Sequence, residues 1–273
     1  MLAESVPTAN LLALACLISA SAVAWWWISA RRLSGRTMIP DSRLDPVVWP
    51  AAIPVLALPL SLGVQLLVSA FGMSLETEPE DLLGKLRIDC LARAGAWVCL
   101  LLLPLAVGPW RATDLGLRRG GLPADLAAGV VTTLAAFGPV LAINVLLSYA
   151  GWKDPAAMHP LLEALLAEPE RVLPWVVFSA VVLAPLHEEL LYRVLLQGGL
   201  ESRLGPVPAI ACSTFLFCAG HLAPGRPDGL ALVPLALLLG WLHVRRHSYI
   251  AVVTAHALFN LINLGLALLP RAA

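Results

Sequence analysis

The chain has 273 residues, of which 59% are hydrophobic and only 13% are charged, and its mean hydropathy is +0.82. Soluble domains contain about 45–50% apolar and about 25% charged residues, so this composition excludes an ordinary soluble protein. Lysine plus arginine and aspartate plus glutamate number 18 each, which leaves no basic excess for binding nucleic acid. We therefore expect an integral, multi-pass membrane protein.

Apolar runs bounded by charge, glycine or proline predict the spans. A helix needs about 20 residues to cross the bilayer core, whereas a β-barrel strand is shorter and alternates apolar with polar residues. The sequence therefore predicts an all-α fold, a polytopic transmembrane bundle of about eight helices. Prolines 50, 54 and 59 predict an irregular start or a kink in the second of them. The spans are predicted near residues 11–30, 47–73, 94–110, 126–149, 172–198, 207–222, 230–244 and 249–269.

The spans divide into two parts. Residues 1–171 hold the first four spans and a segment at 155–170 with the pattern of a short interfacial helix. Residues 172–269 hold the last four spans and the residues that point to chemistry. Arginines follow the first, third, fifth and seventh spans, so these loops are predicted to be cytoplasmic and both termini to lie on the other side. In a bacterium the membrane would be the inner or plasma membrane.

The fifth span carries the segment P185-L-H-E-E-L-L-Y-R193, with three charges and a histidine in an apolar helix. An ionisable side chain at bilayer depth costs at least about 2.5–3.5 kcal/mol, so it needs a partner, a wet cavity or a function. Glu189 and Arg193 are four residues apart, the interval that pairs charges on one helix face. Glu188 is rotated by about 100° and is predicted to be free for chemistry.

Two further polar groups lie in later spans: F217-C-A-G-H221, and H256-A-L-F-N260. Alone, His221 is more typical of a membrane interface, and a pair such as His256 and Asn260 serves equally well as an interhelical hydrogen bond. Counting about 1.5 Å per residue, however, brings Glu188 and these groups to a similar depth in the membrane. The sequence therefore predicts that they share one pocket.

Other sites find less support. Position 191 is leucine, so the HExxH helix of common zinc proteases is absent, and no GxSxG motif or intramembrane aspartate pair occurs. The five cysteines show no CxxC spacing, which argues against a disulfide framework or a zinc ribbon. His243 and His247 flank Arg245 and Arg246, a pattern that indicates a polar cytoplasmic edge.

The three motifs E188-E-x-x-x-R193, F217-x-x-x-H221 and H256-x-x-x-N260 occur in this order on successive apolar segments. In this the chain resembles the CPBP family, the CAAX protease and bacteriocin-processing group that includes the type II CAAX prenyl endopeptidases and the Abi proteins. The resemblance covers residues 172–269. It implies an intramembrane endopeptidase in which Glu188 activates water, Glu189 and Arg193 support it, His221 and His256 orient water or bind metal, and Asn260 positions water or the oxyanion.

The resemblance leaves two mechanisms open, because both a glutamate-dependent and a metalloprotease description exist for the family. Glu188, His221 and His256 could hold Zn²⁺ with an open fourth position, although no cofactor is required. A glutamate-activated water is favoured, because asparagine is a poor zinc ligand and Glu189 is assigned to Arg193. The expected partners are the lipid bilayer and a membrane-associated peptide or protein, which a CAAX-like prenylated substrate would exemplify.

Two other function classes stay open from the residues alone. A non-catalytic scaffold or bacteriocin-immunity protein would keep the polar cluster as interhelical hydrogen bonds. A proton- or metal-coupled transporter would use the same buried carboxylates and histidines as a relay. Substrate identity and oligomeric state do not follow from the sequence.

Overall fold

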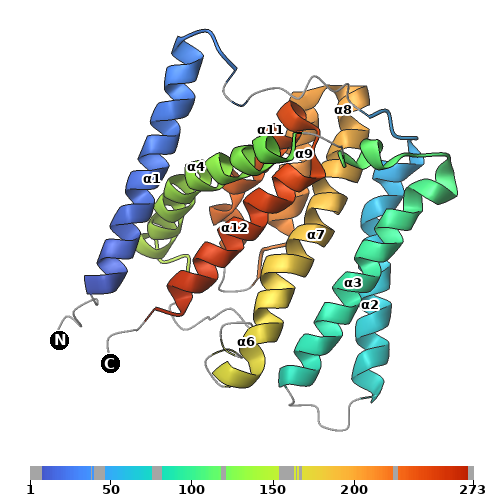
Figure 1. Cartoon of the computed structure of the whole chain (residues 1–273). Coiled ribbons are helices and arrows are strands. Elements are labelled where there is room, and N and C mark those ends of the chain that lie inside the picture. Colours follow the sequence, from blue (N-terminus) through green and yellow to red (C-terminus); the bar gives the residue numbers. More distant parts are fainter. Residues whose placement is uncertain are drawn as a thin grey trace.

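The structure, a computed structural model, describes residues 8–37, 39, 47–75, 82–117, 121–153, 163, 165, 168–223 and 227–269. The regular elements in these ranges are helices, which confirms the predicted all-α fold (Figure 1). Most of the predicted interfacial segment at 155–170 lies outside the described residues.

The first four long helices agree with the first four predicted spans, with shifted ends. Helix α2 begins only at Ala52, after Pro50, as expected for a segment whose prolines remove backbone donors. Helix α3 begins twelve residues earlier than the predicted third span, and this difference matters for the site below. The helices are α1 (Thr8–Leu33), α2 (Ala52–Leu75), α3 (Leu82–Val107) and α4 (Leu122–Tyr149), with the short turn η1 (Ala112–Leu115) before α4.

The fifth span is one continuous helix of 36 residues, Pro169–Leu204. Its backbone changes hydrogen-bonding register along the way, since two π-helical segments flank the α-helical turn that carries the glutamates. The register returns to α beside Pro185, where the missing N–H interrupts the helical ladder. Its parts are α6 (Pro169–Val177), η2 (Phe178–Leu183), α7 (Ala184–Glu189), η3 (Leu190–Gln197) and α8 (Gly198–Leu204).

The last part of the chain contains two helices that are shorter than a full span. Helices α9 (Pro206–Ala219) and α11 (Val233–Arg246) have 14 residues each, or about 21 Å of length, compared with about 30 Å for the bilayer core. The turn α10 (Asp228–Ala231) precedes α11, and α12 (Tyr249–Ala267) ends the bundle. Within the described residues, six helices rather than about eight are long and apolar enough to cross a membrane.

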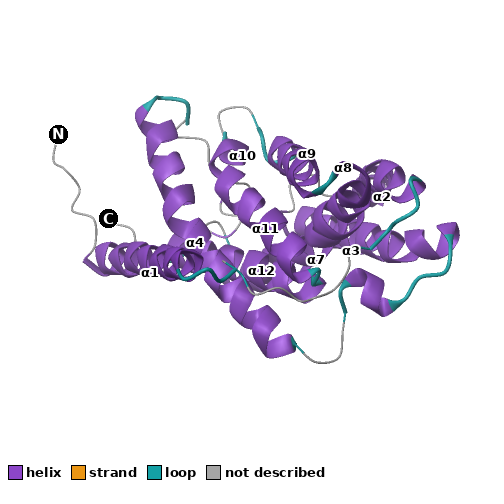
Figure 2. Ribbon diagram, turned by 90° about the horizontal axis from the view of Figure 1, so that it is seen from above, coloured by secondary structure: helices purple, strands orange, loops and turns teal. Residues whose placement is uncertain are grey.

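The long helix runs through the bundle between two outer groups (Figures 1 and 2). The α2–α3 pair lies on one side of it, and α1 packs on α4 at the other. The outer helices expose large apolar side chains, among them Trp26, Leu67 and Phe71. Such a surface suits lipid and is unfavourable in water. The predicted integral, multi-pass membrane protein is thereby confirmed.

A buried ion pair joins α4 to the end of α11. Asp125 and Arg246 are 2% and 4% exposed, and Arg246 donates from Nε and Nη2 to Oδ1 of Asp125 at 2.8 and 2.6 Å. Removing one partner from such a pair leaves an uncompensated buried charge. Replacing both by apolar residues of similar volume does not.

We expect Asp125→Leu to destabilise the protein by about 3–5 kcal/mol, because Arg246 then lacks its counter-charge. The double variant Asp125→Leu/Arg246→Met should recover most of this loss. Thermal unfolding of the detergent-purified proteins measures both effects. A single variant as stable as the wild type would show that the pair contributes nothing.

Candidate active site

Glu188 lies near the middle of the long helix and faces a cavity of about 680 Å³. His221, His256 and Asn260 line the same cavity. They come from the turn after α9 and from α12, so three separate segments contribute to it. A cavity of this size is in the range of about 300–1,000 Å³ that is usual for ligand pockets.

The Glu188 carboxylate has a polar neighbour on three sides. Its Oε2 atom lies 3.8 Å from Nε2 of His221 and 3.9 Å from Nε2 of His256. Its Oε1 atom accepts a hydrogen bond from Nη1 of Arg93 at 3.3 Å. The two imidazole distances exceed hydrogen-bond length, and Oε2 has no hydrogen-bond partner among the described residues.

The Nδ1 atom of each imidazole is hydrogen-bonded to a group on the side away from Glu188. Nδ1 of His221 lies 2.8 Å from the carbonyl oxygen of Phe217, which only accepts, so Nδ1 carries the proton. Nδ1 of His256 donates to Oε1 of Glu189 at 2.6 Å. In the neutral tautomers both Nε2 lone pairs therefore point into the site. A histidine oriented from behind in this way is typical of metal-binding and general-base imidazoles.

Glu189 and Arg193 form the supporting layer, as the four-residue interval predicts. Their side chains are fully buried, and Nε of Arg193 lies 3.4 Å from Oε2 of Glu189. The guanidinium also stacks over Phe217, 4.5 Å from the ring centroid, and the same ring packs against His221 and His256. The phenylalanine of the second motif thus separates the supporting ion pair from the open cavity and holds both imidazoles.

Backbone carbonyls of the π-helical segments accept hydrogen bonds from side chains of neighbouring segments. In η2, Ala180 O accepts from Nδ2 of Asn260 at 2.7 Å. In η3, Tyr192 O and Val194 O accept from Ser213 and Trp49. Carbonyls freed inside a membrane need such partners, and π-helical turns occur frequently at functional sites.

His187 also lines the cavity, but its side chain is hydrogen-bonded to another helix and not to Glu188. Its Nε2 atom lies 2.7 Å from Oγ of Ser61 on α2. The residue therefore joins the long helix to α2.

Arg93 is the site residue that the sequence interpretation missed. It pairs with Asp89 one turn earlier (2.9 Å) and with Glu188 (3.3 Å), so Glu188 is not the free carboxylate that was expected. The predicted third span began at residue 94, which placed both charges outside the membrane, whereas α3 begins at Leu82. The interval between Asp89 and Arg93, the same as between Glu189 and Arg193, is the signal that could have identified them.

The donor set also fits a metal ion chemically. A carboxylate oxygen and two Nε2 lone pairs are common zinc ligands, and both imidazoles have the acceptor behind them that metal-bound histidines usually have. The distances of 3.8 and 3.9 Å are wider than the roughly 3.4 Å between ligands in a tetrahedral zinc site. The three groups would have to move closer together before they could share one zinc ion.

The sequence of this region matches a known family of proteins. Residues 170–262 match the family model described as type II CAAX prenyl endopeptidase Rce1-like. Over these residues the chain is similar to the Rce1-like family. The predicted resemblance is thereby confirmed, and the Rce1-like family implies a protease. The comparisons with curated proteins and with solved structures gave no match. All three motifs of the Rce1-like region lie on the cavity or directly behind it.

We expect Arg93→Met to lower the cleavage rate by about tenfold to a hundredfold, because a hydrogen bond to a charged group contributes about 1.5–3 kcal/mol. Arg93→Lys keeps the charge and should retain more activity. Initial rates at several substrate concentrations separate kcat from KM. A positioning role requires the loss to fall mainly on kcat, and wild-type kcat in Arg93→Met would contradict it.

Proposed function

We propose that the chain is an intramembrane endopeptidase that hydrolyses a peptide bond of a membrane-associated protein or peptide with a water activated by Glu188. The observation that carries the proposal is the arrangement of Glu188, His221, His256 and Asn260 along one cavity among apolar helices. A carboxylate and two imidazoles are costly to keep among apolar membrane helices, and this cost favours a functional role for them.

The reaction begins with a water held between Glu188 and the imidazole Nε2 atoms. Glu188 takes one proton from this water while the water oxygen attacks the scissile carbonyl carbon. The attack forms a tetrahedral oxyanion. The C–N bond then breaks, and the proton passes from Glu188 to the leaving amine. The products are a new carboxylate and a new amino terminus.

Two groups are in place to stabilise the oxyanion. The Asn260 amide has a second N–H besides the one donated to Ala180 O. Arg93 supplies a positive charge beside Glu188, which offsets the negative charge that develops on the substrate. Donors fixed before the reaction lower the barrier most when water is excluded.

Glu189 is assigned a positioning role. It does not line the cavity. Its Oε1 atom is hydrogen-bonded to His256, and its Oε2 atom forms the ion pair with Arg193. This arrangement favours Glu188 as the base. Glu188, His221 and His256 are also the residues that would hold a zinc ion, which when bound would polarise the carbonyl and acidify water. The proposal does not require it.

The cavity lining supports a lipid-linked or strongly apolar substrate. Besides the polar cluster, its walls carry leucines from α2, the long helix, α11 and α12, among them Leu58, Leu235 and Leu264. An apolar wall beside a few fixed polar groups suits a ligand with a hydrocarbon part and one reactive bond. A prenylated CAAX-like peptide has this composition and is the substrate to test first.

Glu188→Gln should lower cleavage at least about a hundredfold, because an amide cannot take the proton from water. The matched control is Glu170→Gln, the same chemical change at an exposed position of the same long helix, which should cleave like the wild type. Both purified proteins should show the same thermal unfolding. Full activity of a folded Glu188→Gln protein would eliminate the proposed base.

A peptide of one sequence, prepared with and without a farnesyl group on its cysteine, tests the substrate class. We expect the lipidated form to be cleaved at least about tenfold faster at low concentration, because burying each methylene contributes about 0.8 kcal/mol. Mass spectrometry of the products identifies the bond. Equal rates for the two peptides would rule out recognition of the lipid, and would leave the test of Glu188 unaffected.

A further inference from the structure

A line of buried polar residues continues beyond the active site along the long helix. Gln197 and Glu201 follow Arg193 at intervals of four residues, so they lie on the same helix face. Arg193 Nη2 donates to Ala236 O at 3.4 Å, and Gln197 Nε2 donates to Gly240 O at 2.9 Å. Both pairs are 43 residues apart, which shows that the long helix and α11 run parallel in one register.

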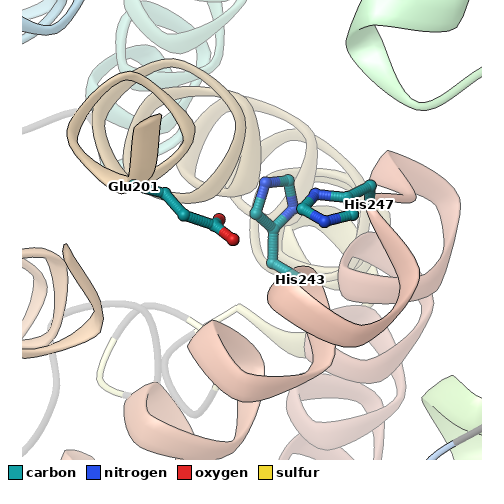
Figure 3. A group of neighbouring side chains, drawn as sticks. All are labelled: Glu201, His243 and His247. Atoms are coloured by element: carbon teal, nitrogen blue, oxygen red, sulfur yellow. The ribbon is translucent and has the colours of Figure 1, made fainter. Parts of the chain in front are cut away.

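The next step of this register brings Glu201 to the end of α11, where two histidines lie. Glu201, His243 and His247 each offer one ligand atom, and these atoms all lie within 4.8 Å of one another. Figure 3 shows the Glu201 carboxylate pointing from one helix towards the two imidazoles of the other. The imidazole rings are 5.7 Å apart and nearly perpendicular.

The cluster is buried and incompletely satisfied. Glu201 is 8% exposed and His243 is 6% exposed. Neither Oε2 of Glu201 nor Nδ1 of His243 has a hydrogen-bond partner within the described ranges. A buried carboxylate oxygen or imidazole nitrogen without a partner is unfavourable, because it has lost its hydrogen bonds to water. A bound cation between them would satisfy both atoms.

A small cavity lies at this position. Its volume is about 10 Å³, and all three side chains line it, which gives space for about one water-sized particle. Asp114 also lines the cavity, but its Oδ2 accepts from the backbone N–H of Arg111 at 2.7 Å. The space is therefore about the size of one ion. One carboxylate oxygen and two imidazole nitrogens are available to bind it.

We propose that Glu201, His243 and His247 bind one divalent transition-metal ion of the zinc type. Two imidazole nitrogens and one carboxylate oxygen are a frequent zinc donor set, with the fourth position left to water. This site is separate from the Glu188 cavity, since Glu201 lies about 20 Å further along the same helix. The ion would link the end of α8 to the end of α11, at the last of the polar contacts between the two helices.

Zinc binding to the full chain in detergent tests the site. The protein is stripped with a chelator, titrated with Zn²⁺ by calorimetry, and its bound metal is counted after dialysis. The test variant is His247→Asn, because His247 has a positive φ of 41° that asparagine tolerates well, and asparagine is a poor zinc ligand. We expect it to lose one equivalent of zinc, or to bind that equivalent at least about tenfold more weakly.

The matched control is His256→Asn, which removes an imidazole from the other cavity. It should keep the equivalent that His247→Asn loses, and zinc should raise the unfolding temperature of His256→Asn but not of His247→Asn. Three results would overturn the proposal: no zinc bound by the wild type, wild-type binding by His247→Asn, or loss of the only equivalent in His256→Asn. The last of these would assign the metal to the Glu188 cavity instead.

Discussion

The fully buried ion pair of Glu189 and Arg193 is the interaction on which the catalytic half of the molecule depends. Two charges that are removed from water lose their hydration, and this cost is offset only if further polar partners surround them. Here His256 binds the carboxylate, while the Phe217 ring and the Ala236 carbonyl face the guanidinium. These partners come from α12, α9 and α11. The contacts of this one pair thus connect three helices around the turn that carries Glu188.

Local spacing made part of this site predictable. Glu189 and Arg193 share one helix, so the interval of four residues alone places them together. Arg93 was missed although it is four residues from Asp89, because its own charge lowers the hydropathy that defines a span and because its partner Glu188 is 95 residues away. The pairing of Glu201 with His243 is non-local too. The sequence contains each residue but not the helix register that brings them together.

The backbone of the long helix marks another limit of sequence reasoning. Nothing in its composition distinguishes the π-helical segments η2 and η3 from ordinary helix. Their carbonyls are held by donors from other segments, namely Asn260, Ser213 and Trp49. The predicted count of about eight spans is approximate for a related reason. Hydropathy detects α9 and α11, but their 14-residue lengths are set by Gly205 and by the αL turn at His247.

The brevity of α9 and α11 has a consequence for the surrounding lipid. A helix that is several ångströms too short produces hydrophobic mismatch, which the bilayer relieves by thinning around it. His221 follows α9 directly, so thinning there would bring headgroups and their hydration towards the Glu188 cavity. The rate of the reaction would then depend on the acyl-chain length of the lipids, since a thicker membrane would reduce the access of water to the cavity.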